Sequence, residues 1–297
     1  MATSNLDGVS RGERLRHNAL FRLGVMATCL MVWLVAFRGL AIPALRGLGP
    51  PGSAVGDGAR VLGALIYVAG GLYIYHALVR LIERRSTTEL ARDPGIGLGF
   101  CGFTIGLALC SSAIGVMWLA GAAKPIGFGD SSHIVASFTA ATMASVGEEL
   151  LFRAILFRIL EQSLGTLRAL LVSALIFGLV HLVNPDATLI SSLAISLEAG
   201  LLLGLAFVVT RNLWFPIGIH LAWNFAQGGI YGASGSSESP SLIEMAFFGP
   251  NWVTGGATGT DTSAVTIILC VAATVTFALM ARNRGHWEPA RLRFRLG

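Results

Sequence analysis

The sequence is short of charged residues. Only 12% of its 297 residues are Asp, Glu, Lys or Arg, whereas 54% are hydrophobic and the mean hydropathy is +0.70. Soluble globular proteins carry roughly 25% charged residues. The shortage therefore excludes an ordinary soluble domain. It predicts an all-helical protein that crosses the membrane several times, because helices satisfy their own backbone groups in lipid.

Lysine is almost absent. Lys124 is the only lysine, so arginine supplies nearly all the positive charge behind a net charge of +5. The arginines cluster between apolar segments and near the two ends, which is typical of a membrane protein that follows the positive-inside rule. We therefore expect no nucleic-acid partner, and the lipid bilayer is the expected surrounding.

Cysteine is scarce, and its spacing fits no metal or redox motif. All four cysteines lie in apolar runs and none forms a CxxC pair, so we expect core thiols. No small-residue cleavage site follows the first apolar run, and the sequence ends without a lipidation signal. We expect that run to be retained as a membrane span.

Apolar runs between polar stretches give about eight candidate spans. They cover residues 23–37, 61–79, 96–120, 132–160, 167–183, 188–209, 214–230 and 263–280. The polar stretch 80–94 separates the first two from the others. We therefore divide the chain into an N-terminal segment, residues 1–95, with two spans, and a six-helix remainder, residues 96–297.

The distribution of basic residues agrees with eight spans. With the N-terminus inside, 16 Lys and Arg residues fall on the inner side, including Arg158 at the inner end of the fourth span, and four fall on the outer side; Arg153 alone lies deep within a span. Because inner loops are rich in Lys and Arg, both termini are expected in the cytoplasm.

Three ionisable residues stand within the fourth span. Glu148, Glu149 and Arg153 lie inside otherwise apolar sequence, and ionisable residues within membrane helices commonly mark functional sites. Glu149 and Arg153 are four residues apart and can pair on one helix face. Glu148 is rotated by about 100° from Glu149. We therefore expect an intrahelical ion pair and a second acid that points into a cavity.

Polar residues on two further spans reach a similar depth. At ~1.5 Å of rise per residue, Glu148 lies ~18 Å, His181 ~20 Å, Asn224 ~16 Å and His220 ~10 Å from the cytoplasmic ends of their helices. A carboxylate and an imidazole can activate water as general bases. A second imidazole and an amide can stabilise an oxyanion. The set suits hydrolysis of an amide bond inside the bundle, without a serine or cysteine nucleophile.

Three motifs resemble one family. They are E-E-x-x-x-R at residues 148–153, F-x-x-x-H at residues 177–181 and H-x-x-x-N at residues 220–224, all within residues 132–230. In this order they resemble the CAAX-protease and bacteriocin-processing family, also called Abi or type II CAAX prenyl endopeptidase-like, of intramembrane proteases. The resemblance implies an eight-span helical fold with its active site inside the bundle.

The resemblance also implies roles for the motif residues. It makes Glu148 and His181 the water-activating pair and His220 and Asn224 the oxyanion-stabilising pair, with Glu149 and Arg153 in support. The expected substrate is a membrane-associated peptide or protein. The expected location is a bacterial inner or plasma membrane.

Several alternatives stay open. Members of the family have been regarded as metalloproteases, and Glu148, His181 and His220 could hold zinc; without an H-E-x-x-H motif we favour no cofactor. A non-catalytic scaffold or an ion- or proton-coupled transporter could use the same polar cluster. Glu198, another acid within a span, either lines the cavity or forms a satisfied packing contact.

Overall fold

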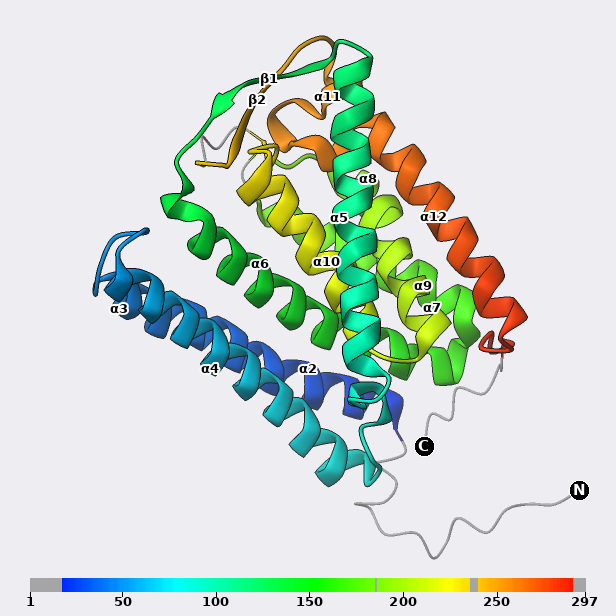
Figure 1. The fold of residues 1–297 in the computed structure, drawn as a ribbon. Helices are drawn as coiled ribbons and strands as arrows, with labels where there is room; N and C mark the ends of the chain where they lie inside the picture. Colours follow the sequence, from blue (N-terminus) through cyan, green and yellow to red (C-terminus); the bar gives the residue numbers. More distant parts are fainter. Residues whose placement is uncertain (1–17, 185, 236–239, 291–297) are drawn as a thin grey trace, which may run out of the picture.

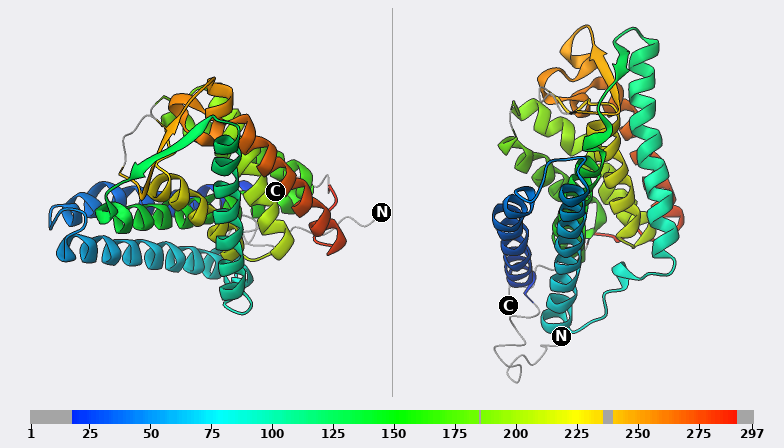
Figure 2. Two further views of the ribbon diagram at one scale, coloured as in Figure 1. Left: turned by 45° about the horizontal axis from the view of Figure 1, so that its top comes forward. Right: turned by 60° about the vertical axis from the view of Figure 1, so that its left-hand side comes forward.

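The computed structural model describes residues 18–184, 186–235 and 240–290, and they form a bundle of long helices (Figure 1). The main helices are α2 (Ala19–Ala36), α4 (Ala54–Leu78), α5 (Gly95–Leu119), α6 (Ile134–Glu149), α7 (Arg158–Val180), α9 (Leu201–Thr210), α10 (Trp214–Phe225) and α12 (Ala264–Asn283). Helices α2 and α4 lie side by side along one flank, and α4 packs on α6 (Figure 2). The predicted all-helical membrane architecture is confirmed.

Shorter elements connect or extend these helices. They are the α-helices α3 (Ile42–Arg46), α8 (Leu189–Ile195) and α11 (Asn251–Thr254); the π-helical segments η1 (Phe37–Ala41), η2 (Val79–Glu83), η5 (Leu150–Phe157), η7 (Ser196–Gly200) and η8 (Ala226–Ile230); and the 3-10 turns η3 (Thr88–Leu90), η4 (Ser131–His133), η6 (His181–Val183), η9 (Gly256–Thr258) and η10 (Thr260–Thr262). Segment η5 directly follows the two adjacent glutamates. Such π-helical turns are frequent at functional sites because they re-aim side chains.

Side-chain caps define where several helices begin. The Asn18 side chain accepts hydrogen bonds from two backbone N–H groups in the first turn of α2. Ser53 and Ser263 do the same, with one bond each, for α4 and α12. At the start of α8, Thr188 and Ser191 form a capping box. Each cap satisfies N–H groups that lack a partner within the helix.

Six helices among the described residues are long and apolar enough to cross a membrane, whereas we predicted about eight spans. One helical stretch, residues 131–183, contains both the fourth and the fifth predicted spans. Gly165 interrupts it with φ 75°, and a Cβ there would lie 2.7 Å from the backbone of Pro289 and Ala290. The seventh predicted span is α10, of 12 residues, extended by the 5 residues of η8, which is short for a membrane helix. The difference therefore has two sources: one helical stretch holds two predicted spans, and the seventh predicted span is a short helix.

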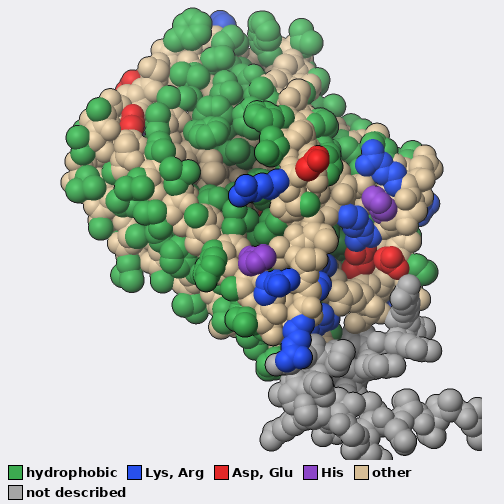
Figure 3. Space-filling view, turned by 60° about the horizontal axis from the view of Figure 1, so that its bottom comes forward, with side chains coloured by type: hydrophobic (Ala, Val, Ile, Leu, Met, Phe, Trp, Pro, Cys, Tyr) green, Lys and Arg blue, Asp and Glu red, His purple; other side chains and the backbone are tan. Residues whose placement is uncertain are grey.

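The surface fits a membrane environment. Hydrophobic side chains are spread over much of the face seen in Figure 3, and most of the charged side chains gather toward one end of it. The predicted orientation, with both termini in the cytoplasm, stays a prediction. The arginines before residue 18 and after residue 290, which entered that prediction, lie outside the described residues.

A small antiparallel sheet joins two segments that lie between predicted spans. Strand β1 (Ala123–Phe128) pairs with β2 (Ile243–Phe247), with Ala123 opposite Phe247 and Phe128 opposite Ile243. The sheet lies at the top of the bundle in Figure 1. It anchors the long segment between α10 and α12 to the end of α5, and that segment reaches the site described below.

Helices α5 and α10 approach each other at glycines. A Cβ at Gly102 would lie 2.2 Å from the Phe215 carbonyl oxygen, and one at Gly218 would lie 2.3 Å from the Gly99 carbonyl oxygen. Small residues permit such close backbone contact between membrane helices. This packing fixes α10, the helix that carries His220 and Asn224.

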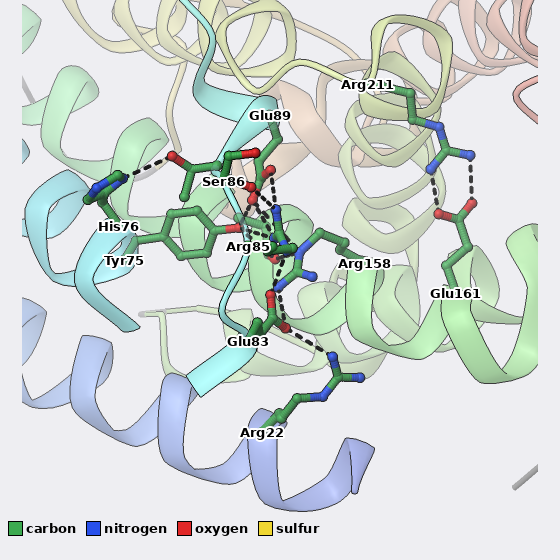
Figure 4. Close-up of polar contacts among 12 residues, drawn as sticks. Arg22, Tyr75, His76, Glu83, Arg85, Ser86, Glu89, Arg158, Glu161 and Arg211 are labelled. Carbon is green, nitrogen blue, oxygen red and sulfur yellow. Dashed lines mark hydrogen bonds and ion pairs between the residues drawn. The ribbon is translucent and has the colours of Figure 1, made fainter. Parts of the chain in front are cut away.

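The polar stretch 80–94 folds onto the bundle as a buried ion cluster (Figure 4). Glu83 accepts hydrogen bonds from Arg22 of α2 at 3.2 Å and from Arg158 of α7 at 2.9 Å. Arg85 contacts both Glu83, at 2.8 Å, and Glu89, at 2.7 Å. The cluster ties the first two helices to the rest of the bundle. The domain boundary at residue 95 stays a prediction.

Glu89 is expected to make stability depend on pH. Burial alone would raise its pKa, but hydrogen bonds from Arg85 and Tyr75 outweigh that effect and lower the pKa. Because the folded-state pKa lies below the unfolded value of about 4.3, the stabilisation is present above that pH and is lost as the pH falls toward the folded-state pKa.

The Glu89→Gln variant should therefore lose less thermal stability than the wild type as the pH is lowered from about 5 to 3, as measured by thermal unfolding in detergent. Glu244, which is exposed on β2, offers the matched control, and Glu244→Gln should follow the wild-type curve. Parallel acid limbs for the wild type and Glu89→Gln would contradict the assignment.

Candidate active site

Four of the predicted site residues line one cavity. Glu148 comes from the end of α6, His181 from η6, and His220 and Asn224 from α10. The cavity has a volume of about 80 Å³. A water molecule needs roughly 10–15 Å³ on the same measure. The helices therefore bring these side chains together around a space that can hold water.

Glu149 and Arg153 form the predicted ion pair. Arg153 Nη1 donates to Glu149 Oε1 at 2.9 Å, and both side chains are 0% exposed. Arg153 Nη2 also lies 3.2 Å from the carbonyl oxygens of Ala199 and Gly200 in η7. A buried pair of this kind offsets its desolvation cost only with such additional hydrogen bonds. The pair thus connects the fourth predicted span to the sixth.

His220 lies between the two glutamates. Its Nδ1 is 2.9 Å from Glu149 Oε1, and its Nε2 is 3.8 Å from Glu148 Oε2. A carboxylate accepts hydrogen bonds and does not donate them. Nδ1 therefore carries a proton and donates it to Glu149, and this bond turns Nε2 toward Glu148.

His181 has a different partner. Its Nδ1 lies 2.7 Å from the backbone oxygen of Phe177, one helical turn earlier. Since a carbonyl only accepts, Nδ1–H is the donor, and Nε2 of the neutral ring is an acceptor. The bond caps the C-terminal end of α7. It also fixes the tautomer that a base would need.

Glu148 has a buried oxygen without a hydrogen-bond partner among the described residues. That atom is Oε2, although the side chain as a whole is 29% exposed. The contact to His220 Nε2 is too long for a hydrogen bond. Leaving a buried acceptor unsatisfied costs about 1–3 kcal/mol, so the atom is suited to receive a hydrogen bond from water or substrate.

Phe177 organises the site, a role that the sequence reasoning missed. Its ring lies 4.8 Å from the ring of His181 and 6.2 Å from that of His220, and the Arg153 guanidinium lies 4.5 Å from its centroid. Phe152 packs edge-on against it at 5.0 Å. Its place four residues before His181 was the available sequence signal, because i,i+4 residues share a helix face.

Asp261 was also missed. It lies on η10, in the loop before α12, and lines the same cavity. Trp223 Nε1 on α10 and Gln227 Nε2 on η8 donate to its Oδ1 at 2.9 and 2.6 Å. Burial raises the pKa of Asp261 despite these bonds. Gln227 in a predicted span was the one sequence signal, since a buried amide needs a partner.

The Asp261→Asn variant should be at least as thermally stable as the wild type at pH 7–8. Both hydrogen bonds end on Oδ1, which asparagine retains, and the substitution removes a buried charge. The folded-state pKa is raised above the unfolded-state value. The wild type therefore loses stability as the pH rises from the unfolded-state pKa through the folded-state pKa, because the carboxyl becomes charged. Asp261→Ala should instead lose about 1–3 kcal/mol through two unsatisfied donors. Equal loss in both variants, measured by unfolding in detergent, would contradict this account.

Glu198 lines the cavity and also makes a packing contact, so both alternatives considered from the sequence are present. Its side chain on η7 is 3% exposed. Cys270 Sγ on α12 lies 3.8 Å from its Oε1, a weak hydrogen bond.

A second cavity meets the first at Glu148 and His181, which line both. It has a volume of about 320 Å³ and is mainly apolar, with walls from α2, α4, α6 and η5. Arg38 and Tyr67 are polar residues on its wall. This second cavity places an apolar space next to the reactive groups.

Zinc is the metal that the sequence left open, with Glu148, His181 and His220 as ligands. In the part of the chain that the structure describes, no group of three His, Cys, Asp or Glu side chains is arranged to hold a metal ion. As they are arranged in the structure, the three residues therefore do not form a set of zinc ligands.

The central third of the chain matches a known protein family. Residues 130–226 match the family model described as type II CAAX prenyl endopeptidase Rce1-like. No curated protein and no solved structure matches the chain. The matched range contains all three motifs and, with them, Glu148, His181, His220 and Asn224. Residues 130–226 are therefore a domain of the Rce1-like type II CAAX prenyl endopeptidase family, set in a membrane protein of several apolar helices.

Proposed function

We propose that the protein is an intramembrane endopeptidase that hydrolyses a peptide bond of a membrane-associated peptide or protein with water activated by Glu148 and His181. The family supports a membrane endopeptidase in general. The observation that carries the finer proposal is Glu148 Oε2, which is buried on the wall of a cavity shared with His181 and has no hydrogen-bond partner among the described residues.

In the proposed reaction, Glu148 accepts a proton from water as the water oxygen attacks the carbonyl carbon. Nε2 of His181 accepts a second hydrogen bond from the same water and orients it, because Nδ1 of that ring is already engaged by Phe177. The proton on Glu148 then passes to the leaving nitrogen as the C–N bond breaks. General acid–base catalysis of this kind contributes about 10²- to 10⁴-fold to the rate.

His220 and Asn224 are proposed to stabilise the oxyanion. His220 donates Nδ1–H to Glu149, so Nε2 must also be protonated to donate to an oxyanion. The Glu149 carboxylate accepts from Nδ1–H and so orients the ring, as a carboxylate does beside a catalytic histidine. Glu149 is thus proposed as a positioning residue, and Arg153 holds Glu149 in place.

The second cavity is proposed as the path by which the substrate reaches Glu148. Its apolar walls suit a segment that arrives from lipid, and it shares Glu148 and His181 with the first cavity. We also propose the orientation with both termini in the cytoplasm and a bacterial inner or plasma membrane as the location. The basic-residue count supports the orientation.

The test uses the purified full-length protein in liposomes with lipid-anchored and membrane-spanning reporter peptides. Mass spectrometry should find two new peptide ends that add one water, and the His181→Ala variant should not produce them. Ion or proton flux across the liposome membrane without any cleavage would contradict the proposal and favour a transporter.

A further inference from the structure

A large apolar groove lies apart from the catalytic cavity. It has a volume of about 660 Å³ and is lined by residues of α5, α6 and α10 and by Val68 of α4. Its walls include the aromatic rings of Phe103 and Phe138 and the backbone of Gly99. None of the residues proposed for catalysis lines it. We call it the α5–α10 groove.

One end of the groove carries a positive charge. Arg92 is the only charged residue among the described residues that line the groove, and it is exposed just before α5 begins. Trp214, at the start of α10, lies on the wall too. Tryptophan is enriched where membrane proteins meet the headgroup layer. The combination assigns Arg92 to the interface and the rest of the groove to the hydrocarbon layer.

The length of the groove fits one leaflet. From Gly95 to Phe103 the α5 wall advances eight residues, which is about 12 Å at 1.5 Å per residue. One half of the hydrocarbon core is about 15 Å thick. An acyl chain that lies in the groove therefore has its polar end near Arg92.

We propose that the α5–α10 groove binds a phospholipid with an anionic headgroup, with an acyl chain along Gly99, Phe103 and Phe138 and the headgroup at Arg92. The charge selects the headgroup, because basic pockets between membrane helices on the cytoplasmic side bind anionic lipids. The apolar walls select the chain. The site is independent of the proposed proteolysis, although Leu221 and Val146 on its wall stand close in sequence to His220 and Glu148.

The test compares lipid binding by the purified full-length protein in detergent, measured by native mass spectrometry with phosphatidylglycerol and phosphatidylcholine of identical chains. Phosphatidylglycerol should bind about fivefold more tightly, the contribution of one arginine near a membrane surface. Arg92→Gln should remove that preference. Arg168→Gln should keep it, since Arg168 is an exposed arginine on α7 that does not line the groove.

A second pair of variants, both on α5, tests the position of the acyl chain. A Cβ at Gly99 would sit at ordinary contact distance from Trp214, whereas a Cβ at Gly97 would meet nothing within 4 Å. Gly99→Leu fills the groove and should weaken the binding of both lipids, and Gly97→Leu should not.

The proposal would be overturned by equal binding of the two lipids by the wild type, by an unchanged preference in Arg92→Gln, or by unchanged binding in Gly99→Leu. Binding of a lipidated peptide in preference to phosphatidylglycerol would also overturn it, because it would assign the groove to substrate.

Discussion

Replacing Glu148 with glutamine is expected to lower the rate of peptide cleavage by about 10²- to 10⁴-fold, the contribution of a general base. Glutamine keeps the size of the side chain but does not accept the proton of the attacking water. The measurement is the initial rate of reporter cleavage in liposomes. Because this side chain is partly exposed and its Oε2 makes no hydrogen bond in the described structure, the unfolding midpoint should change little.

Glu198→Gln provides the matched control. Glu198 is a second acid on the wall of the same cavity, but its contact is with Cys270 rather than with a catalytic histidine. Its replacement should leave most of the cleavage activity. Wild-type activity in Glu148→Gln, or an equal loss in both variants, would contradict the assignment of Glu148 as the base.

Replacing Arg153 with leucine is expected to destabilise the protein by about 3–5 kcal/mol, the cost of leaving a buried partner charge uncompensated. Glu149 would keep only its bond from His220, and the carbonyl oxygens of Ala199 and Gly200 would lose a donor. Unfolding in detergent micelles measures the effect.

The double variant Arg153→Leu with Glu149→Leu separates the ion pair from packing. Because both charges are removed together, it should be more stable than Arg153→Leu alone. If the two substitutions instead destabilise the protein additively, the pair contributes no coupling and the account of this contact is wrong.

The intrahelical part of the site was predictable because helix geometry fixes it. Four residues separate Glu149 from Arg153, and that spacing predicted the ion pair found at 2.9 Å. Depth within the membrane predicted that Glu148, His181, His220 and Asn224 would meet, and all four line one cavity. Their chemical roles stay proposals, since position alone does not establish catalysis.

The long-range part was not predictable from local patterns. Asp261 reaches the cavity from a loop whose sequence resembles a linker, and the pairing of β1 with β2 and the bonds from α10 and η8 hold it there. Glu83 and Glu89 were read as part of a polar boundary, yet their partners include Arg158, more than 60 positions away. Periodicity carries no information about such contacts.

The predicted number of spans exceeds the number of long apolar helices for two reasons. Residues 131–183 count as one helical stretch, although Gly165 interrupts it with a positive φ between the fourth and fifth predicted spans. The second reason is the length of α10. This helix, which contains Pro216 and Gly218, has only 12 residues, and the sequence prediction counted it together with η8 as one full span.

The most direct test of the proposed mechanism is the cleavage rate of the metal-depleted wild-type protein, compared in the same liposomes with metal-depleted Glu148→Gln. The account predicts that chelation leaves the wild-type rate unchanged while the variant cleaves at least about a hundredfold more slowly. Loss of wild-type cleavage on chelation, with recovery on addition of zinc, would contradict the account.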